Sequence, residues 1–377
     1  MNHWKETADV FGRLAELAAA GERAALATVV GIAGSAYRRP GAKLLLEAAG
    51  GTLGSVSGGC LEADVREVAK EVLTTGRPSL RHYDTGADED VVWGLGLGCN
   101  GRVDVFVQPA TEGPLAERAA TLRELLAGDA PFAVATLVEA GEEAAAAGAG
   151  ERPGAVLVVA PGGSVSGSLG SAALDAQVAE LVLRSLSATS PGGRSGVHRV
   201  AGRGVFVEVL PPPTHLVVCG AGDDARPLVA YAADAGFRVT VVDHRPALLA
   251  PAWFPGAARL LLARAEQPAV ALPPAARSLA VVKTHSLGQD REWVRRLLAA
   301  GLPYVGVLGP RARTAAILAA IGAPEGLAER VFGPVGLDLG ADGPQQVALS
   351  IVAELLAFEA RREPRHLAAR REAIHAV

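Results

Sequence analysis

The stretch HLVVCGAGDDARPLVAYAADAGFRVTVVDHRP, residues 215–246, decides the fold of the C-terminal half of this chain. It begins with an apolar strand, turns tightly through glycines, continues as a helix and ends in a second strand that closes with an acid. Gly220, Gly222 and Ala225 occupy the positions of a G-x-G-x-x-G/A motif, and Asp243 follows after about 20 residues. Strand, turn, helix and acid together predict a Rossmann-like unit.

The glycine turn of this unit also suggests a ligand. Gly220 permits the turn, Gly222 lets the backbone approach a pyrophosphate, and the helix N-terminus stabilises the negative charge. Asp243 would accept hydrogen bonds from ribose hydroxyls. Asp223 and Asp224 depart from the small or apolar residues usual in such a turn, and they would lie close to a phosphate. The pattern therefore leaves open whether NAD(P), another nucleotide or no nucleotide binds.

The elements that follow continue the alternation of strands and helices. Strands at ARLLLA, SLAVVKTH and YVGVLG alternate with helices at 290–300 and from about Arg311, which is typical of a doubly wound parallel sheet. His285 and Arg311 follow two of these strands at their carboxyl ends, where ligands bind in open α/β sheets. We take both as candidate binding residues. The alternatives are a turn histidine bonded to the backbone and a solvated arginine.

The N-terminal half contains an internal duplication. RPGAKLLLEAAGGTLGSVSGG, which begins at Arg39, matches RPGAVLVVAPGGSVSGSLGS, which begins at Arg152, and LEADVREV matches LDAQVAEL shortly after each. Two copies are too few for a solenoid, which needs three or more repeats. We interpret the match as a duplicated unit of β-strand, turn, β-strand, Gly-rich loop and helix, with copies at about 26–76 and 133–188.

The length of the chain and one proline-rich segment indicate the domain organisation. A chain of 377 residues is expected to form two or three domains, and the proline run LPPPTH marks one boundary. We predict an α/β fold with an N-terminal α/β domain that carries the duplication and a C-terminal Rossmann-like domain. The expected bounds are 1–210 for the first domain, 211–214 for a Pro-rich linker, 215–360 for the second domain and 361–377 for a C-terminal tail.

Composition limits the partners and the compartment. The net charge of −4 provides no basic footprint for nucleic acid. The N-terminus lacks a signal-peptide pattern, and no apolar run approaches the ~20 residues that span a bilayer. Cys60, Cys99 and Cys219 are odd in number and lack Cys-x-x-Cys spacing, which argues against a disulfide framework or a zinc knuckle. We therefore expect a cytoplasmic protein without a membrane span.

The duplication provides an internal control for Cys60. The second copy has Ala172 and Ala173 at the matching turn, and it lacks a counterpart of the GSAYRR segment that contains Arg38. The fold therefore does not need these first-copy residues twice. Cys60 comes just before a predicted helix, whose dipole would stabilise a thiolate able to ligate a metal or carry sulfur. The alternative is a small buried cysteine in a tight Gly-rich turn.

Several motifs together resemble the XdhC/CoxI family of molybdenum-hydroxylase accessory proteins. They are GSAYRRPGAKLLL, GSVSGGCLEADV, GLGLGCNGRVDVFVQP, VKTHSLGQD, YVGVLGPRAR and GPVGLDLGADGPQQVALSIVAELLA, and the resemblance runs from about Leu26 to Leu356. It implies a protein that binds the molybdenum cofactor (molybdopterin) and protects it while a cysteine desulfurase exchanges its terminal oxo ligand for sulfur. The resemblance further implies delivery to an apo-molybdenum hydroxylase, xanthine dehydrogenase or a relative, and hence a chaperone rather than a catalyst.

The resemblance rests on the Cys60 loop, on Cys99 in the second Gly-rich segment and on the Rossmann-like turn. It implies that Cys60 ligates molybdenum or carries sulfur. Lys283 and Pro310 replace the smaller residues expected at their positions. The full set of candidate cofactor-binding residues is Cys60, Cys99, Arg38, Gly58, Gly59, Gly220, Gly222, Asp243, His285 and Arg311.

Two other functions compete with the chaperone hypothesis. One is an NAD(P)-dependent oxidoreductase that uses Asp243 for ribose, although no catalytic Tyr-x-x-x-Lys or His/Asp pair follows the glycine turn. The other is a scaffold that only joins the desulfurase to its target. We also expect a homodimer, because the duplicated Gly-rich half exposes loops that a second copy would cover.

Overall fold

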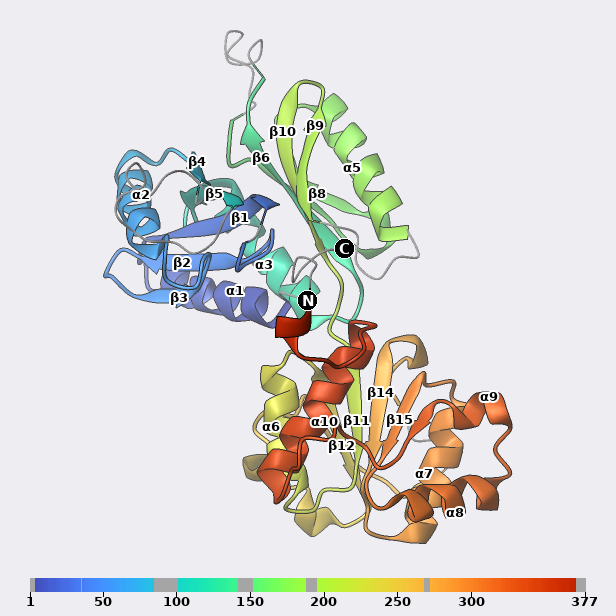
Figure 1. Cartoon of the computed structure of the whole chain (residues 1–377). Coiled ribbons are helices and arrows are strands. Elements are labelled where there is room, and N and C mark those ends of the chain that lie inside the picture. Colours follow the sequence, from blue (N-terminus) through green and yellow to red (C-terminus); the bar gives the residue numbers. More distant parts are fainter. Residues whose placement is uncertain are drawn as a thin grey trace. The chain divides into compact units, whose positions relative to one another are not determined.

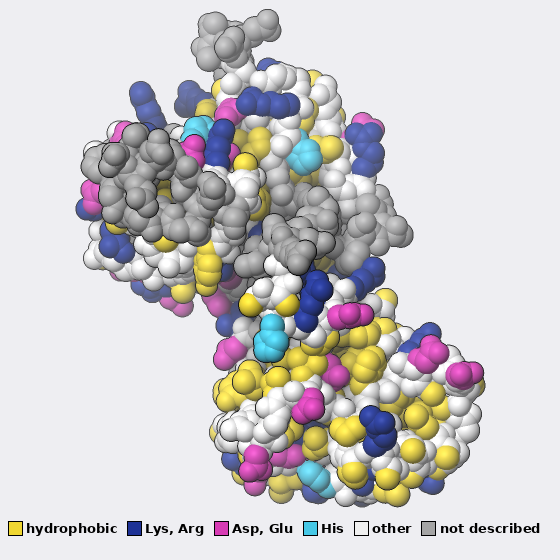
Figure 2. Space-filling view, viewed as in Figure 1, with side chains coloured by type: hydrophobic (Ala, Val, Ile, Leu, Met, Phe, Trp, Pro, Cys, Tyr) yellow, Lys and Arg dark blue, Asp and Glu magenta, His cyan; other side chains and the backbone are white. Residues whose placement is uncertain are grey.

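The structure is a computed structural model that describes residues 4–34, 36–84, 101–141, 152–187, 195–267 and 272–370. It divides into two compact units, one built on residues 2–212 and the other on residues 213–369 (Figure 1). Within the described ranges, no helix is long and apolar enough to cross a membrane. On the face shown in Figure 2, basic and acidic side chains of the described residues are interspersed.

The unit of residues 213–369 is built around a six-stranded sheet in the order β13-β12-β11-β14-β15-β16, with every neighbouring pair parallel. Its core strands are rich in β-branched and other apolar residues and are buried on both faces, as is typical of a parallel sheet. Helices α6 and α10 cover one face of the sheet, and α7 and α8 cover the other. The predicted doubly wound, Rossmann-like sheet is confirmed.

The elements of this unit have the following bounds: β11 (His215–Cys219), α6 (Ala225–Asp234), β12 (Arg238–Asp243), β13 (Arg259–Leu262), β14 (Ser278–Val282), α7 (Leu287–Ala299), β15 (Tyr304–Val307), α8 (Arg311–Ile321), α9 (Glu325–Ala328), β16 (Val331–Phe332) and α10 (Pro344–Glu359). Helix α7 begins earlier than the predicted 290, because Ser286 forms its N-cap and the N–H of Asp290 already donates to the Ser286 carbonyl.

The strand order of this sheet changes direction at β11. The strand pairs with β12 on one side and with β14 on the other, so that Cys219 lies opposite Val242 and Val282 at the carboxyl ends. The chain runs outward from this point in both directions, which is the switch point where open α/β sheets bind ligands. Gly220 is required there: its φ is +119°, and a Cβ would lie 2.5 Å from the Lys283 carbonyl oxygen.

The unit of residues 2–212 contains two five-stranded antiparallel sheets of matching order, β3-β2-β1-β5-β4 and β8-β7-β6-β10-β9. The first copy and the elements beside it comprise α1 (Trp4–Ala19), β1 (Ala24–Gly34), β2 (Lys43–Glu47), β3 (Thr52–Gly54), α2 (Glu62–Thr75), β4 (Ser79–Asp84), β5 (Gly101–Pro109) and α3 (Gly113–Ala127). The second copy comprises β6 (Phe132–Glu139), β7 (Val156–Val159), β8 (Val165–Gly167), α5 (Ala172–Ser187), β9 (Gly196–Val200) and β10 (Arg203–Leu210). The matching orders confirm the predicted duplication.

The inner strands of each sheet of this unit, β1, β2 and β5 in the first and β6, β7 and β10 in the second, are mostly buried on both faces. In β1, Ala25 and Ala27 pack against Val65 of α2, whereas Leu26 points into a core shared with α1, α3 and the second sheet. Helix α5 covers the outer face of the second sheet in the same way as α2 covers the first. The duplicated halves therefore meet through their inner faces, and their outer faces carry one helix each.

A charged pair lies in this shared core. The ammonium of Lys43 in β2 contacts the carboxylate of Glu208 in β10, and the two side chains are only 3% and 8% exposed. Lys43 also donates a hydrogen bond to the Gly41 carbonyl at 2.9 Å. Both residues line a cavity of about 30 Å³ between the sheets. The sequence pattern did not predict this pair, which spans the two copies.

Candidate functional site

Three first-copy segments lie near one end of the inner strands β1 and β5 of the first sheet. The end of β1 at Gly34 pairs with Gly101 at the start of β5. A Cβ on Gly58 would lie 2.8 Å from the ring of Tyr37, so this ring rests against the Cys60 loop. The structure thus joins the segment after β1 to the loop before α2. Ser35 of the GSAYRR segment and Cys99 lie outside the described residues, and a cofactor role for Cys99 stays a prediction.

The edge strand β4 also contacts the helix that follows the Cys60 loop. The hydroxyl of Tyr83 in β4 donates to the carboxylate of Asp64 in the first turn of α2 at 2.6 Å. Tyr37 is 70% exposed, and Cys60 is exposed as well. An exposed thiol does not match the alternative of a small buried cysteine. Cys219, by contrast, is fully buried in β11, and burial raises the pKa of its thiol.

The Cys60 loop is wrapped around the carboxylate of Glu62. This carboxylate accepts hydrogen bonds from the backbone N–H groups of residues 56–59 and from the hydroxyls of Ser55 and Ser57. Burial raises the pKa of Glu62, but the hydrogen bonds from Ser57, Ser55 and the backbone outweigh it and lower the pKa to about 2. The carboxylate is therefore ionised at neutral pH and fixes the shape of the loop.

The second copy has the same kind of contact, with fewer hydrogen bonds to the acid. The carboxylate of Asp175 accepts hydrogen bonds from the Ser168 hydroxyl and the Leu169 N–H, both at 2.7 Å. An acid at this helix position is thus a framework feature of both copies. What the first copy adds is the glycine pair 58–59, at φ +86° and +123°, followed by the exposed Cys60. Glu62 was not among the predicted residues, although an acid at matching positions of both copies was a usable signal.

Replacing Glu62 with Gln should loosen this loop. A neutral amide cannot accept all of these hydrogen bonds, and bonds to a charged group contribute about 1.5–3 kcal/mol. We expect the amides of residues 56–59 to exchange with deuterium at least about tenfold faster. Asp175→Asn is the matched control and should speed exchange only around Leu169. Unchanged exchange at 56–59 in the Gln variant would show that the carboxylate does not hold the loop.

Arg38 lies next to this loop but is bound elsewhere. Its guanidinium forms an ion pair with Glu6 of α1, and Glu6 also accepts the backbone N–H of Lys43 at 3.1 Å. The pair anchors the segment after β1 to the first helix. A contact between Arg38 and a cofactor stays a prediction.

In the Rossmann-like unit, Asp243 binds the glycine turn directly. Its carboxylate accepts hydrogen bonds from the N–H of Ala221 at 2.8 Å and from two nitrogen atoms of the Arg245 guanidinium at 2.9 and 3.0 Å. Burial raises the pKa of Asp243, but the hydrogen bonds from Arg245 and the backbone outweigh it and lower the pKa to about 2. The side chain is only 1% exposed. Its acceptor sites are thus used within the chain, and a ribose contact stays a prediction.

Asp224 and Lys283, which both differ from the residues expected at their positions in the Rossmann-like unit, form an ion pair. Asp224, in the glycine turn, lies 2.6 Å from the ammonium of Lys283, which follows β14. His285 approaches the other carboxylate oxygen of Asp224 at 3.4 Å. Burial raises the pKa of Asp224, but Lys283 outweighs it and keeps the carboxylate ionised. Asp223 is mostly exposed and pairs with Arg226 at 2.8 Å.

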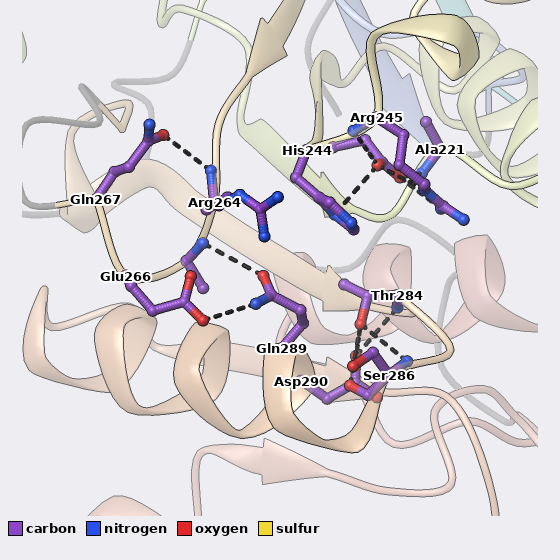
Figure 3. Close-up of polar contacts among 12 residues, drawn as sticks. Ala221, His244, Arg245, Arg264, Glu266, Gln267, Thr284, Ser286, Gln289 and Asp290 are labelled. Atoms are coloured by element: carbon purple, nitrogen blue, oxygen red, sulfur yellow. Dashed lines mark hydrogen bonds and ion pairs between the residues drawn. The ribbon is translucent and has the colours of Figure 1, made fainter.

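The helix starts beside this cluster are held by Asp290, which was also not among the predicted residues. Its buried carboxylate accepts a hydrogen bond from the N–H of Thr284 at 3.0 Å (Figure 3). It also accepts two hydrogen bonds from the guanidinium of Arg313, at 2.6 and 3.0 Å. Arg313 is therefore structural. Arg311 is exposed at the start of α8, and an anion contact by this residue stays a prediction.

Comparisons with known proteins cover both units. Residues 17–84 match the model of the XdhC and CoxI family, and residues 216–355 match the model of the XdhC Rossmann domain. The chain is 31% identical over 337 residues to a probable xanthine dehydrogenase subunit of Bacillus subtilis (strain 168), covering 89% of this chain and 93% of that protein. It is 30% identical over 242 residues to "Uncharacterized protein YqeB" of Escherichia coli (strain K12), covering 60% of this chain and 43% of that protein.

A solved structure agrees with these matches. The crystal structure of a xanthine dehydrogenase from Bacillus halodurans is similar to this chain with a TM-score of 0.74 and 26% sequence identity. The match covers 96% of this chain and 98% of that one. The similarity therefore extends over both units and over the duplicated sheets.

Proposed function

The chain belongs to the XdhC and CoxI family, and on that premise we propose that it is an accessory protein that binds the molybdenum cofactor and delivers it to a xanthine dehydrogenase-type hydroxylase. The relatives named as xanthine dehydrogenase proteins support the choice of target. In this proposal the chain is a carrier, and the hydroxylase is the enzyme that uses the cofactor.

The observation that carries the proposal is the exposed thiol of Cys60 on a loop whose glycines and cysteine have no counterpart in the second copy. A thiolate is the kind of ligand that soft metal centres prefer and is also the nucleophile of sulfur transfer. The donor thus fits the cofactor, which would supply a molybdenum centre. Gly58 and Gly59 present bare backbone beside the thiol, and Glu62 holds that backbone in place.

The proposal includes two further partners. A cysteine desulfurase would supply the sulfur, and a second copy of the chain would cover the exposed loops as a homodimer. A reducing compartment such as the cytoplasm suits an exposed thiol of this kind.

An NAD(P)-dependent oxidoreductase fits the Rossmann-like turn poorly. A Cβ on Gly222 would lie 2.8 Å from a carboxylate oxygen of Asp224, so a negative charge occupies the space that a pyrophosphate approaches in this motif. The carboxylate of Asp243 is at the same time bonded to Ala221 and Arg245. A dinucleotide would have to displace the Asp224 carboxylate, and the Asp243 carboxylate that should bind its ribose is already hydrogen-bonded within the chain.

The molybdenum and pterin content of the purified protein tests the proposal. We expect molybdenum, by mass spectrometry of the metal, and pterin fluorescence to co-purify from a host that makes the cofactor. The same protein from a host that cannot make the cofactor is the control and should contain neither. Protein that lacks both molybdenum and pterin from the competent host would reject cofactor binding and favour the scaffold hypothesis.

A further inference from the structure

The outward face of α10 carries no charge over about four helical turns. Between Pro344 and Phe358, all of which the structure describes, the one charged residue is Glu354. Its carboxylate is turned inward, where it accepts hydrogen bonds from the Tyr304 hydroxyl at 2.5 Å and the Gly336 N–H at 2.8 Å. A helix that packs on a domain normally has charged and polar residues on its outer face. The composition of α10 is therefore that of a helix covered on both sides.

Two large apolar side chains lie on this outward face. Leu349 and Leu356 are 56% and 41% exposed, whereas the opposite face of the helix is buried in the core. Residues seven apart lie on the same side of a helix, and Ala353 lies between the two leucines on that side. Tyr231 of the adjacent helix α6 is exposed as well (Figure 1 shows the two helices). Apolar side chains grouped in this way mark an interaction surface.

A groove of about 380 Å³ continues this surface at the start of α10. Its lining includes Gln345 of α10, Tyr231 of α6 and Trp253. The charge of Arg226 in its wall is paired within the chain, because the guanidinium lies 2.8 Å from Asp223 and 4.1 Å from the ring centre of Trp253. We call the surface formed by Gln345, Leu349, Ala353, Leu356 and Tyr231 the α10 face.

The spacing on the α10 face fits a second copy of the same face. When identical helices pair antiparallel across a two-fold axis, residue i of one copy meets residue j of the other, and j meets i. With Ala353 near the axis, Leu349 of each copy lies beside Leu356 of the other. The small alanine side chain lets the two helices approach closely, and no like charges meet near the axis.

The charges at the two ends of α10 favour the same arrangement. Asp338 and Asp342 precede the helix, and residues 361–365 after it comprise three arginines, one glutamate and one proline. All of these residues are exposed. Antiparallel pairing brings the acidic end of one copy beside the basic end of the other and also opposes the two helix dipoles. A parallel pair would place like ends together.

We propose that two copies of this chain bind each other through the α10 face, with the two α10 helices antiparallel across a two-fold axis. The inference deepens the proposed function, because it rests on the homodimer included there and assigns the pairing to the Rossmann-like unit. The interface is apolar along the helices and charged at their ends.

Sedimentation equilibrium of the full-length chain, from a host that cannot make the cofactor, tests this surface. Wild type should have twice the chain mass of 38.4 kDa. Leu349→Glu places a charge in the apolar seam and should raise the dissociation constant of the dimer at least about tenfold. Leu287→Glu is the matched control, because Leu287 is 49% exposed at the start of α7, on the other face of the sheet, and this variant should pair as wild type does.

Disulfide cross-linking gives a second measurement that also reports the direction of the helices. In a Cys60→Ser background, oxidised glutathione should join two copies of Ala353→Cys through the introduced thiols. Leu349→Cys mixed with Leu356→Cys should cross-link, whereas Leu349→Cys alone should not. Peptide mass spectrometry identifies the linked residues. These variants decide the matter even if Leu349→Glu does not fold.

Three results would overturn the inference. They are a wild-type chain that stays monomeric at every concentration, a dimer that a folded Leu349→Glu variant leaves intact, and cross-links that join copies of Leu349→Cys to each other. None of these measurements involves molybdenum or pterin. A monomer that still co-purifies with both would reject the pairing and leave the carrier function standing, and a dimer that contains neither would do the reverse.

Discussion

Replacing Cys60 with serine is expected to reduce activation of the target hydroxylase at least about tenfold, since loss of even an outer partner of a metal ligand typically costs 10–100-fold. The variant should still fold, with a free energy of unfolding within about 0.5 kcal/mol of wild type, because the side chain is exposed. The second copy supports this expectation, since alanines stand at its matching turn. Serine keeps the size of the side chain but lacks the sulfur.

The measurement is hydroxylase activity after co-expression with each variant in a cofactor-producing host. Cys219→Ala is the control for losing a cysteine without touching the loop, because Cys219 is fully buried in β11. Alkylation by iodoacetamide adds a direct check, and Cys60 should react in the folded protein while Cys219 should not. Full activation by Cys60→Ser would mean that the thiol has no part in cofactor handling.

Replacing Lys43 with methionine is expected to give the largest loss of stability. Glu208 would keep its charge in the core between the two sheets, with its partner gone. Breaking a buried pair in this way typically costs about 3–5 kcal/mol. For a unit of this size the loss corresponds to a fall in melting temperature of about 6–20 °C.

Thermal unfolding with hydrogen exchange to identify the unit checks this expectation. Lys70→Met is the matched control, because Lys70 pairs with Glu67 on the exposed face of α2 and such pairs contribute about 0–1 kcal/mol. The double variant Lys43→Met, Glu208→Leu should recover much of the loss, since apolar replacements of a buried pair are often neutral. A single variant as stable as wild type would show that Glu208 is not held as a buried charge.

Local patterns in the sequence were sufficient for the fold class. Glycines at 220 and 222, an apolar strand before them and an acid at 243 specify a strand, turn and helix through backbone geometry alone, and the structure has that unit. The duplication was equally visible, because two copies of one pattern require no knowledge of contacts. The comparison of copies also singled out Cys60, whose thiol is exposed.

Contacts between distant residues were decided only by the tertiary structure. Lys43 and Glu208 are 165 residues apart, and each stands in an apolar strand of a different copy. Val156 replaces Lys43 in the second copy and Gln108 replaces Glu208 in the first, so neither copy alone contains the pair. In the same way, Asp224 and Lys283 looked like separate departures from their motifs until parallel pairing of β11 and β14 placed them 2.6 Å apart. Periodicity records which face of a strand is buried, whereas the partner of a buried charge depends on how sheets stack and strands align, and a linear pattern does not contain that information.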